Sequence, residues 1–146
     1  DWVKPLWREA IITTTVKLPN HTHIFLTKLP QNLPKEWPPN CWVGVSVTTN
    51  GDMTRALTHL VNVKASVRFL SIEPLLGKIG MSDHMSMRGI VDWLIIGCCT
   101  PVSPKTMCKF EWVEEIVKAV DKAKIPIFIK PPLSDIMNLH RQEFPK

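Results

Sequence analysis

The sequence predicts an α/β fold, either a partial (β/α) barrel or an open, largely parallel five-stranded sheet with helices on its outer face. Three observations lead to this prediction. Five short runs are rich in β-branched and aromatic residues, as strands are. Most of these runs are apolar at nearly every position, which is typical of parallel strands covered on both faces. Segments with helical periodicity lie between several of the runs, as in βαβ units.

The five expected strands should lie in the sheet in the order of the chain. They cover residues 24–28, 42–47, 67–72, 93–97 and 127–130. A closed eight-stranded barrel usually takes about 250 residues, so these strands can form only an arc of a barrel or an open sheet. One edge of the sheet must then be exposed, or covered by a partner or by a further part of the protein.

Four helices are expected around these strands. The clearest runs from Phe110 to Lys124, since its apolar residues recur with helical spacing, its acids come early and its lysines late. A second helix should begin after Asp52 as its N-cap. Its apolar side would carry Met53, Leu57, Leu60 and Val61. A third should cover residues 5–17, with Leu6, Trp7, Ala10 and Ile11 on one side, and a fourth should lie within residues 134–143. The proline-rich stretch 31–41 and the stretch 77–89 should be loops, or loops with a short helical turn.

Composition limits the function classes. The 146 residues, 45% of them hydrophobic, predict a single α/β domain over residues 1–146, and no apolar run approaches the roughly 18 residues that span a bilayer. The net charge of +5 weakly favours anionic partners, but the basic residues are scattered, so nucleic-acid binding is neither indicated nor excluded. The four cysteines have no CxxC spacing, which favours free thiols in a reducing, cytoplasmic compartment and no metal site. No GxGxxG, Walker or GxSxG motif is present.

Polar residues gather where the expected strands end, and this carboxyl edge is where ligands bind in parallel α/β folds. Glu73 is the sharpest candidate, as a ligand anchor or general base, against the alternative of a solvated or lysine-paired carboxylate. Lys28 and Lys130 can neutralise a ligand anion, or can simply extend into water. Ser46 and Ser71 can hold a ligand, although a hydroxyl bonded to nearby backbone is commoner. Glu73 between the two lysines would suit a zwitterion such as an amino-acid moiety, unless the three form only a surface salt bridge.

The cysteines and histidines give weaker signals. Cys98 and Cys99 follow Gly97 directly, but without an adjacent basic partner small buried hydrophobes are favoured over reactive thiolates. No HxxE or HxxxH ligand pair is formed by His21, His23, His59, His84 and His140.

One order of segments is unusual enough to be specific. It consists of His23-Ile-Phe-Leu-Thr-Lys28, Trp37-Pro-Pro-Asn40 with Trp42-Val-Gly-Val-Ser-Val47, Val67-Arg-Phe-Leu-Ser-Ile-Glu-Pro-Leu-Leu-Gly77, Asp92-Trp-Leu-Ile-Ile-Gly97 and Ile127-Phe-Ile-Lys130. Over roughly His21 to Pro131 the chain thereby resembles a phage-associated family of radical-SAM-like (β/α) barrel proteins of unknown function. Three segments depart from the family pattern, at Thr48, at residues 97–100 and at residues 131–133. The residues that the resemblance still assigns to ligand binding are Lys28, Ser46, Glu73 and Lys130.

The resemblance implies S-adenosylmethionine and a [4Fe–4S] cluster for the full-length protein, with the three cluster-binding cysteines in a segment before this chain. The chain would then be the C-terminal part of a longer barrel, in line with its abrupt start at Asp1, and we expect it to hold no cluster and to be inactive alone. The alternative is a stand-alone, non-catalytic α/β binding module or partner subunit with an anion- or nucleoside-binding carboxyl edge. Either way, S-adenosylmethionine or another small zwitterionic or nucleoside ligand is the expected partner. A second copy or the missing N-terminal part would cover the exposed sheet edge.

Overall fold

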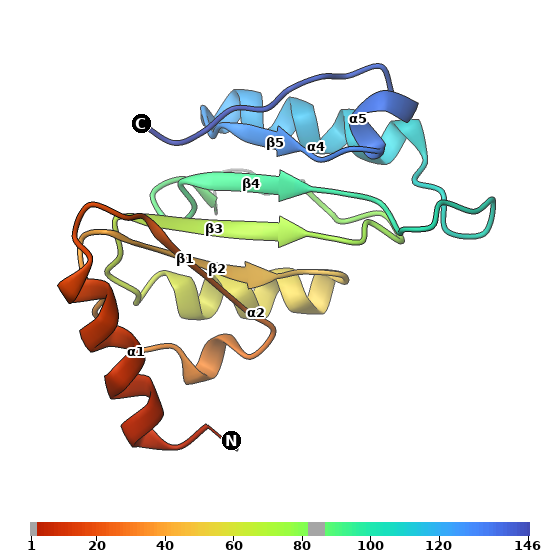
Figure 1. Ribbon diagram of the computed structural model, residues 1–146. Coiled ribbons are helices and arrows are strands. Elements are labelled where there is room, and N and C mark those ends of the chain that lie inside the picture. The colour runs from red at the N-terminus through yellow and green to blue at the C-terminus, as the bar shows by residue number, and fades with distance from the viewer. Residues whose placement is uncertain (1–2, 82–86) are drawn as a thin grey trace.

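The computed structural model describes residues 3–81 and 87–146, so His84 lies outside the described residues. Five parallel strands form one sheet in the order of the chain (Figure 1). They are β1 (His23–Thr27), β2 (Cys41–Ser46), β3 (Val67–Ile72), β4 (Trp93–Ile96) and β5 (Ile127–Ile129). The helices are α1 (Pro5–Lys17), α2 (Asn50–Leu60), α4 (Phe110–Ala123) and α5 (Leu133–Ile136), with a 3-10 turn η1 (Pro30–Asn32). The α/β fold class, the parallel pairing and the strand order are confirmed.

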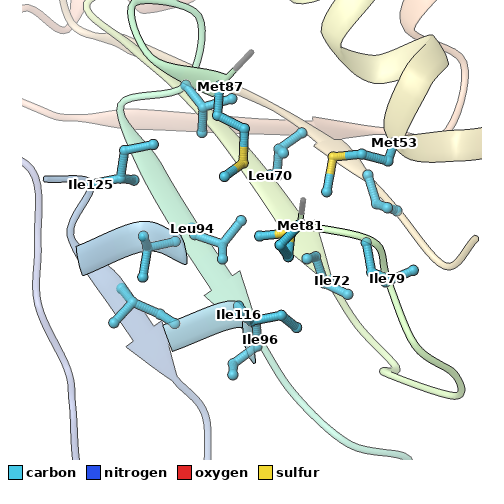
Figure 2. Packing of buried hydrophobic residues seen from close by; sticks show 14 of the residues in the cluster. Met53, Leu70, Ile72, Ile79, Met81, Met87, Leu94, Ile96, Ile116 and Ile125 are labelled. Carbon is cyan, nitrogen blue, oxygen red and sulfur yellow. The ribbon is translucent and has the colours of Figure 1, made fainter. Parts of the chain in front are cut away.

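The main core lies between one face of the sheet and the helices α2 and α4, which cover that face (Figure 1). Leu70 and Ile72 of β3 and Leu94 and Ile96 of β4 point into it and are fully buried. Figure 2 shows these side chains together with Met53 from α2 and Ile116 from α4. Burial of so many aliphatic groups is the main force that holds the two helices on the sheet.

Helix α2 begins earlier than expected. Thr49, not Asp52, is the N-cap, and Asp52 is the third residue of a capping box: the Thr49 hydroxyl accepts from Asp52 N at 3.1 Å, and Asp52 Oδ2 accepts from Thr49 N at 3.0 Å. In a capping box, threonine and aspartate three residues apart each accept a hydrogen bond from the other's backbone N–H. A start at Thr49 therefore satisfies two backbone donors, whereas Asp52 as N-cap would satisfy one. Val61, expected on the buried side, lies after the helix and is 52% exposed.

Helix α1 has the expected bounds but not the expected buried side. Leu6, Trp7 and Ile11 are exposed, and Thr15 is the residue of this helix that is buried. The C-terminal end of α1 is held by Asn40, whose side-chain amide donates to Thr15 O at 3.0 Å and to the neighbouring turn. The helix therefore keeps much of its apolar surface in solvent.

Helix α4 matches its prediction closely and ends one residue early, at Ala123. Lys124 adopts a left-handed conformation with φ of 59°, which stops the helix before β5. Phe110, expected on the apolar side, is exposed at the first position of the helix. None of the helices formed by the described residues has the length and the apolar run that a bilayer crossing demands.

The C-terminal segment is the clearest error of the sequence prediction. Helix α5 ends at Ile136, and the chain then runs antiparallel along the free side of β5 instead of remaining helical to residue 143. Ile129 N donates to Arg141 O at 2.8 Å and Glu143 N to Ile127 O at 3.0 Å. The Arg141 guanidinium also pairs with Asp121 of α4 at 2.8 Å. These bonds use backbone groups of β5 that an edge strand would leave open.

The second face of the sheet carries rings, and we call it the aromatic face, defined by Trp42, Phe69, Trp93 and Phe128. Trp93 lies at the centre, with ring centroids 5.6 Å from Trp42, 5.6 Å from Phe69 and 6.2 Å from Phe128. Phe69 lies across Gly44, where a Cβ atom would overlap its ring. Strands covered on both faces were expected, but one of the two covers is this ring cluster.

Candidate functional site

The backbone ladder continues beyond the ends of β3, β4 and β5. Gly97 N donates to Ile72 O at 3.2 Å, Leu75 N to Gly97 O at 2.8 Å, and Lys130 N to Ile96 O at 2.9 Å. The residues just past the strand ends are therefore still in register. Counted along each strand, Glu73, Gly97 and Lys130 belong to the same side of the sheet as the aromatic face.

The structure brings Glu73 and Lys130 together at this carboxyl edge. Lys130 Nζ lies 2.8 Å from Glu73 Oε1 and 2.9 Å from Oε2, so one ammonium group bridges both carboxylate oxygens. The side chains are 32% and 43% exposed, so the pair is accessible to a ligand from solvent. This contact joins residues from β3 and β5, which are not neighbours in the sheet.

Gly97 makes this contact possible, and no local sequence pattern indicates this role. Gly97 lies between the two partners, at the end of β4, and a Cβ atom there would come within 2.8 Å of Glu73 Oε1. The Glu73 side chain thus lies over a position that has no side chain of its own. The register, which shows Gly97 between the two strands, is the signal that could have identified its role.

Ser46 and Ser71 stand opposite each other in the register of β2 and β3. Ser71 is only 3% exposed. Neither hydroxyl bonds to any of the residues that the structure describes, which contradicts the expectation that they bond to nearby backbone. Because no buried side-chain oxygen in the described part of the chain lacks a partner, the Ser71 hydroxyl must still reach solvent.

Lys28 is not brought to Glu73. It follows the last residue of β1, where Leu29 N donates to the Thr27 hydroxyl at 3.0 Å, and its side chain is exposed. Within residues 3–81 and 87–146 it has no ion pair. Lys28 follows the last pair of the β1–β2 register, Thr27 with Val45, as Ser46 does on β2.

The N-terminus of α2, which follows β2 at the same edge, is occupied by the protein itself. Asp52 Oδ2 accepts from Thr48 Oγ1 at 2.9 Å and from Thr48 N at 3.2 Å, in addition to Thr49 N. Hydrogen bonds from the Thr48 and Thr49 side chains are the main cause that lowers the pKa of Asp52. The helix end that often binds phosphate in such folds is therefore already neutralised by a carboxylate.

The thiols near Glu73 do not form a donor set for an iron–sulfur cluster. All four cysteines are free, and Cys98 and Cys108 are buried. Burial raises the pKa of the Cys98 thiol, and it raises that of Cys108, whose Sγ donates to Leu75 O, to about 11. No three His, Cys, Asp or Glu side chains among the described residues are grouped so that they could hold a metal ion. Buried thiols with raised pKa values, outside any such group, do not fit a cluster that needs three or four thiolates.

Two hollows of the surface lie away from the Glu73–Lys130 pair. One of about 650 Å³ opens at the opposite, amino edge, lined among others by Arg88, Asp92, Lys124 and Arg141. A smaller apolar one of about 200 Å³ lies between α1 and β1. Residues at the amino edge of such sheets usually serve stability, so the assignment of the site to the carboxyl edge rests on its side chains and not on the shape of a cavity.

Comparison with known proteins gives one match. Residues 1–132 match the model of a family described as "Protein of unknown function (DUF5131)". No curated protein and no solved structure matches the chain. The match covers all five strands and the Glu73–Lys130 pair, but it carries no statement about a ligand.

Proposed function

The chain belongs to the DUF5131 family of proteins of unknown function, and we propose that it binds the amino-acid part of a small zwitterionic ligand at the carboxyl edge of its sheet. The single observation that carries this proposal is the Glu73–Lys130 pair, two opposite charges held 2.8 Å apart and open to solvent. A carboxylate can accept from a ligand ammonium group, and a neighbouring lysine can meet the ligand carboxylate. The ligand we name is S-adenosylmethionine or a related nucleoside.

The competing interpretation is a plain surface salt bridge, which stabilises a protein by only about 0–1 kcal/mol. One feature supports a binding site instead. Two serine hydroxyls that have no partner among the described residues lie on the same side of the sheet. An ion pair that serves only stability does not need them.

The resemblance to radical-SAM-like barrels supports S-adenosylmethionine as the ligand and the role of this chain as the later strands of a longer barrel. When bound, a [4Fe–4S] cluster in such a barrel supplies the electron for reductive cleavage, but the thiols described above do not fit one. We therefore propose that the chain alone is not catalytically competent. Its own residues would bind and orient the ligand.

A non-catalytic binding module or partner subunit is the second candidate. The observation that favours it is the exposed apolar surface of β1, where Ile24 and Leu26, on the same face of the sheet as Trp42, are 57% and 53% exposed. An in-frame cysteine-bearing segment in the upstream coding sequence would favour the barrel fragment. A start codon directly before Asp1 would favour the module.

The proposal is tested by replacing Glu73 with glutamine, which keeps the shape and removes the charge. We expect the wild-type chain to bind S-adenosylmethionine in calorimetry, and Glu73→Gln to weaken binding by about tenfold, since hydrogen bonds to charged groups are worth more than 1 kcal/mol. Glu36→Gln is the matched control. Glu36 forms an exposed ion pair with Lys64 at 3.1 Å, and these two residues precede β2 and β3, away from the carboxyl edge. If neither wild type nor variant binds such compounds at about 1 mM, near the weak end of specific binding, the site assignment fails.

The cluster prediction has its own measurement. Anaerobic reconstitution followed by iron and sulfide analysis should give no stoichiometric cluster on this chain, because its thiols are buried or separated. A [4Fe–4S] cluster that is lost when Cys98 or Cys99 is replaced would contradict the prediction.

A further inference from the structure

We propose that Ser46, Ser71 and Lys28 form an oxyanion-binding half of the site, which takes a carboxylate or phosphate group of the ligand. This inference rests on the proposed function, because it places a second group of the same ligand one row below the Glu73–Lys130 pair. It gives a ligand-binding role to Ser71 and to Lys28, the lysine that does not pair with Glu73.

The two hydroxyls are placed by the sheet itself. Ser46 and Ser71 are register partners on adjacent parallel strands, and alternation puts both on the aromatic face. The neighbours of Ser71 along the same row are Ile95 of β4 and then Phe128 of β5, both half-buried. Two donors thus lie at one end of a short apolar floor, an arrangement typical of small-molecule sites.

The hydroxyls have hydrogen-bonding capacity that the described part of the protein leaves unused. Ser71 is only 3% exposed, yet its oxygen has no partner in residues 3–81 and 87–146 and is therefore open to solvent. A hydroxyl that is open to solvent but unbonded within the described protein is available to donate to a ligand, and we assign this role to Ser71.

The charges select an oxyanion over a neutral group. Lys28 and Ser46 both follow the last β1–β2 pair, and Lys28 is free of ion pairs within the described residues, whereas Lys130 is engaged by both oxygens of Glu73. The N-terminus of α2, the other anion-favouring feature at this edge, is filled by Asp52. A lysine without an ion pair thus remains at the same edge as two hydroxyl donors, and such groups together bind carboxylates and phosphates.

The test uses inorganic phosphate and acetate as probes, titrated into the full chain by calorimetry. We expect saturable binding of at least one probe. The probe that binds more tightly shows whether the site prefers a phosphate or a carboxylate group. Ser71→Ala, Ser46→Ala and Lys28→Gln should each weaken that binding by about tenfold, the usual effect of losing a hydrogen bond to a charged group. Lys35→Gln, an exposed lysine in the proline-rich loop, and Ser66→Ala, whose hydroxyl donates to Cys41 O before β3 begins, should leave it unchanged.

The outcomes separate this inference from the proposed function. Glu73→Gln should leave oxyanion binding unchanged or tighter, because it removes a nearby negative charge, while it weakens binding of S-adenosylmethionine. If neither probe binds, or if binding survives both serine substitutions in variants with wild-type thermal stability, the oxyanion half is wrong even when Glu73 proves to bind a ligand. Oxyanion binding that needs the serines, in a protein that binds no zwitterion, supports the inference and rejects the amino-acid ligand.

Discussion

Gly97 is the residue on which the geometry of the candidate site depends most directly. Replacing it with alanine would put a Cβ atom 2.8 Å from Glu73 Oε1, closer than real Cβ contacts come, and would push the carboxylate away from Lys130. We expect Gly97→Ala to reduce stability by less than about 1 kcal/mol, because the half-exposed Glu73 side chain can move aside, and to weaken ligand binding as much as Glu73→Gln does. Chemical denaturation and calorimetry measure the two effects.

Gly77→Ala is the control for this change. No atom lies within 4 Å of the position that its Cβ would occupy, and its backbone is not left-handed. The substitution should change stability by no more than about 0.5 kcal/mol. A Gly97→Ala variant that binds ligand as well as the Gly77→Ala variant would contradict the dependence of binding on the position of Glu73.

For single residues, the sequence predicts which charged side chains pair better than it predicts the room that a glycine leaves between them. Glu73 and Lys130 both follow apolar runs, so a shared carboxyl edge was enough to bring them together. Lys28 follows such a run too, but β1 lies two strands away from β3 and its lysine remains apart. The role of Gly97 and the unused Ser71 hydroxyl depend on which strands are neighbours, which no local pattern contains.

Among the elements, α2 has the most specific start signal. Asp52→Ala removes the carboxylate that accepts from Thr48 and Thr49, and we expect a loss of about 1 kcal/mol in the free energy of unfolding at neutral pH. Glu111→Ala in the first turn of α4 is the control, since α4 has no side-chain cap and its first-turn acid acts through the helix dipole. Equal losses in the two variants would show that the capping hydrogen bonds contribute nothing.

The same capping box makes the stability of the protein depend on pH. Hydrogen bonds from Thr48 and Thr49 hold the pKa of Asp52 below its ordinary value of 3.8 in the folded state, so the unfolded state takes up a proton first. The stabilisation from Asp52 is therefore complete above that ordinary value and is lost as pH falls through the lowered folded pKa. The stability difference between wild type and Asp52→Ala should shrink in denaturation curves recorded below about pH 4. A difference that does not change with pH would contradict this origin.

Strands were easier to predict than helix ends for a physical reason. A parallel strand with apolar contacts on both faces leaves a nearly continuous apolar run, and all five strands lie within one residue of that run. The segment after α5 has no such pattern. Its extended conformation comes from backbone bonds to β5 and from the contacts of Arg141 with Asp121 and Glu143. Most of these partners are distant in the sequence, so no local pattern indicates them.

For the whole molecule, the packing of the aromatic face is the feature most sensitive to a single atom. Gly44→Ala would drive a Cβ atom into the ring of Phe69, which is 1% exposed and is held by Trp93. We expect a loss of about 1–3 kcal/mol in guanidinium denaturation followed by tryptophan fluorescence. Adding Phe69→Leu should recover part of that loss, because the smaller side chain vacates the position.

The matched substitution is Gly51→Ala, in the first turn of α2. Its Cβ would meet only the Thr49 hydroxyl at 3.7 Å, an ordinary contact. Alanine is also the better helix former, so stability should rise slightly.

The double variant tests the cause of the loss at Gly44. Strictly additive effects of Gly44→Ala and Phe69→Leu on the free energy of unfolding would mean that the new methyl group does not meet the Phe69 ring.

The two edges of the sheet differ, and this difference limits how copies of the protein can associate. The β5 edge is covered by the chain's own residues 141–143, whereas no strand in the described part of the chain pairs with the free side of β1. A protein with two bare edges can polymerise, each copy templating the next into a fibre. Among the described residues β1 is the unpaired edge strand, so pairing of β1 with β1 of another copy would use this edge in both copies, and the covered β5 edges would not extend the sheet further.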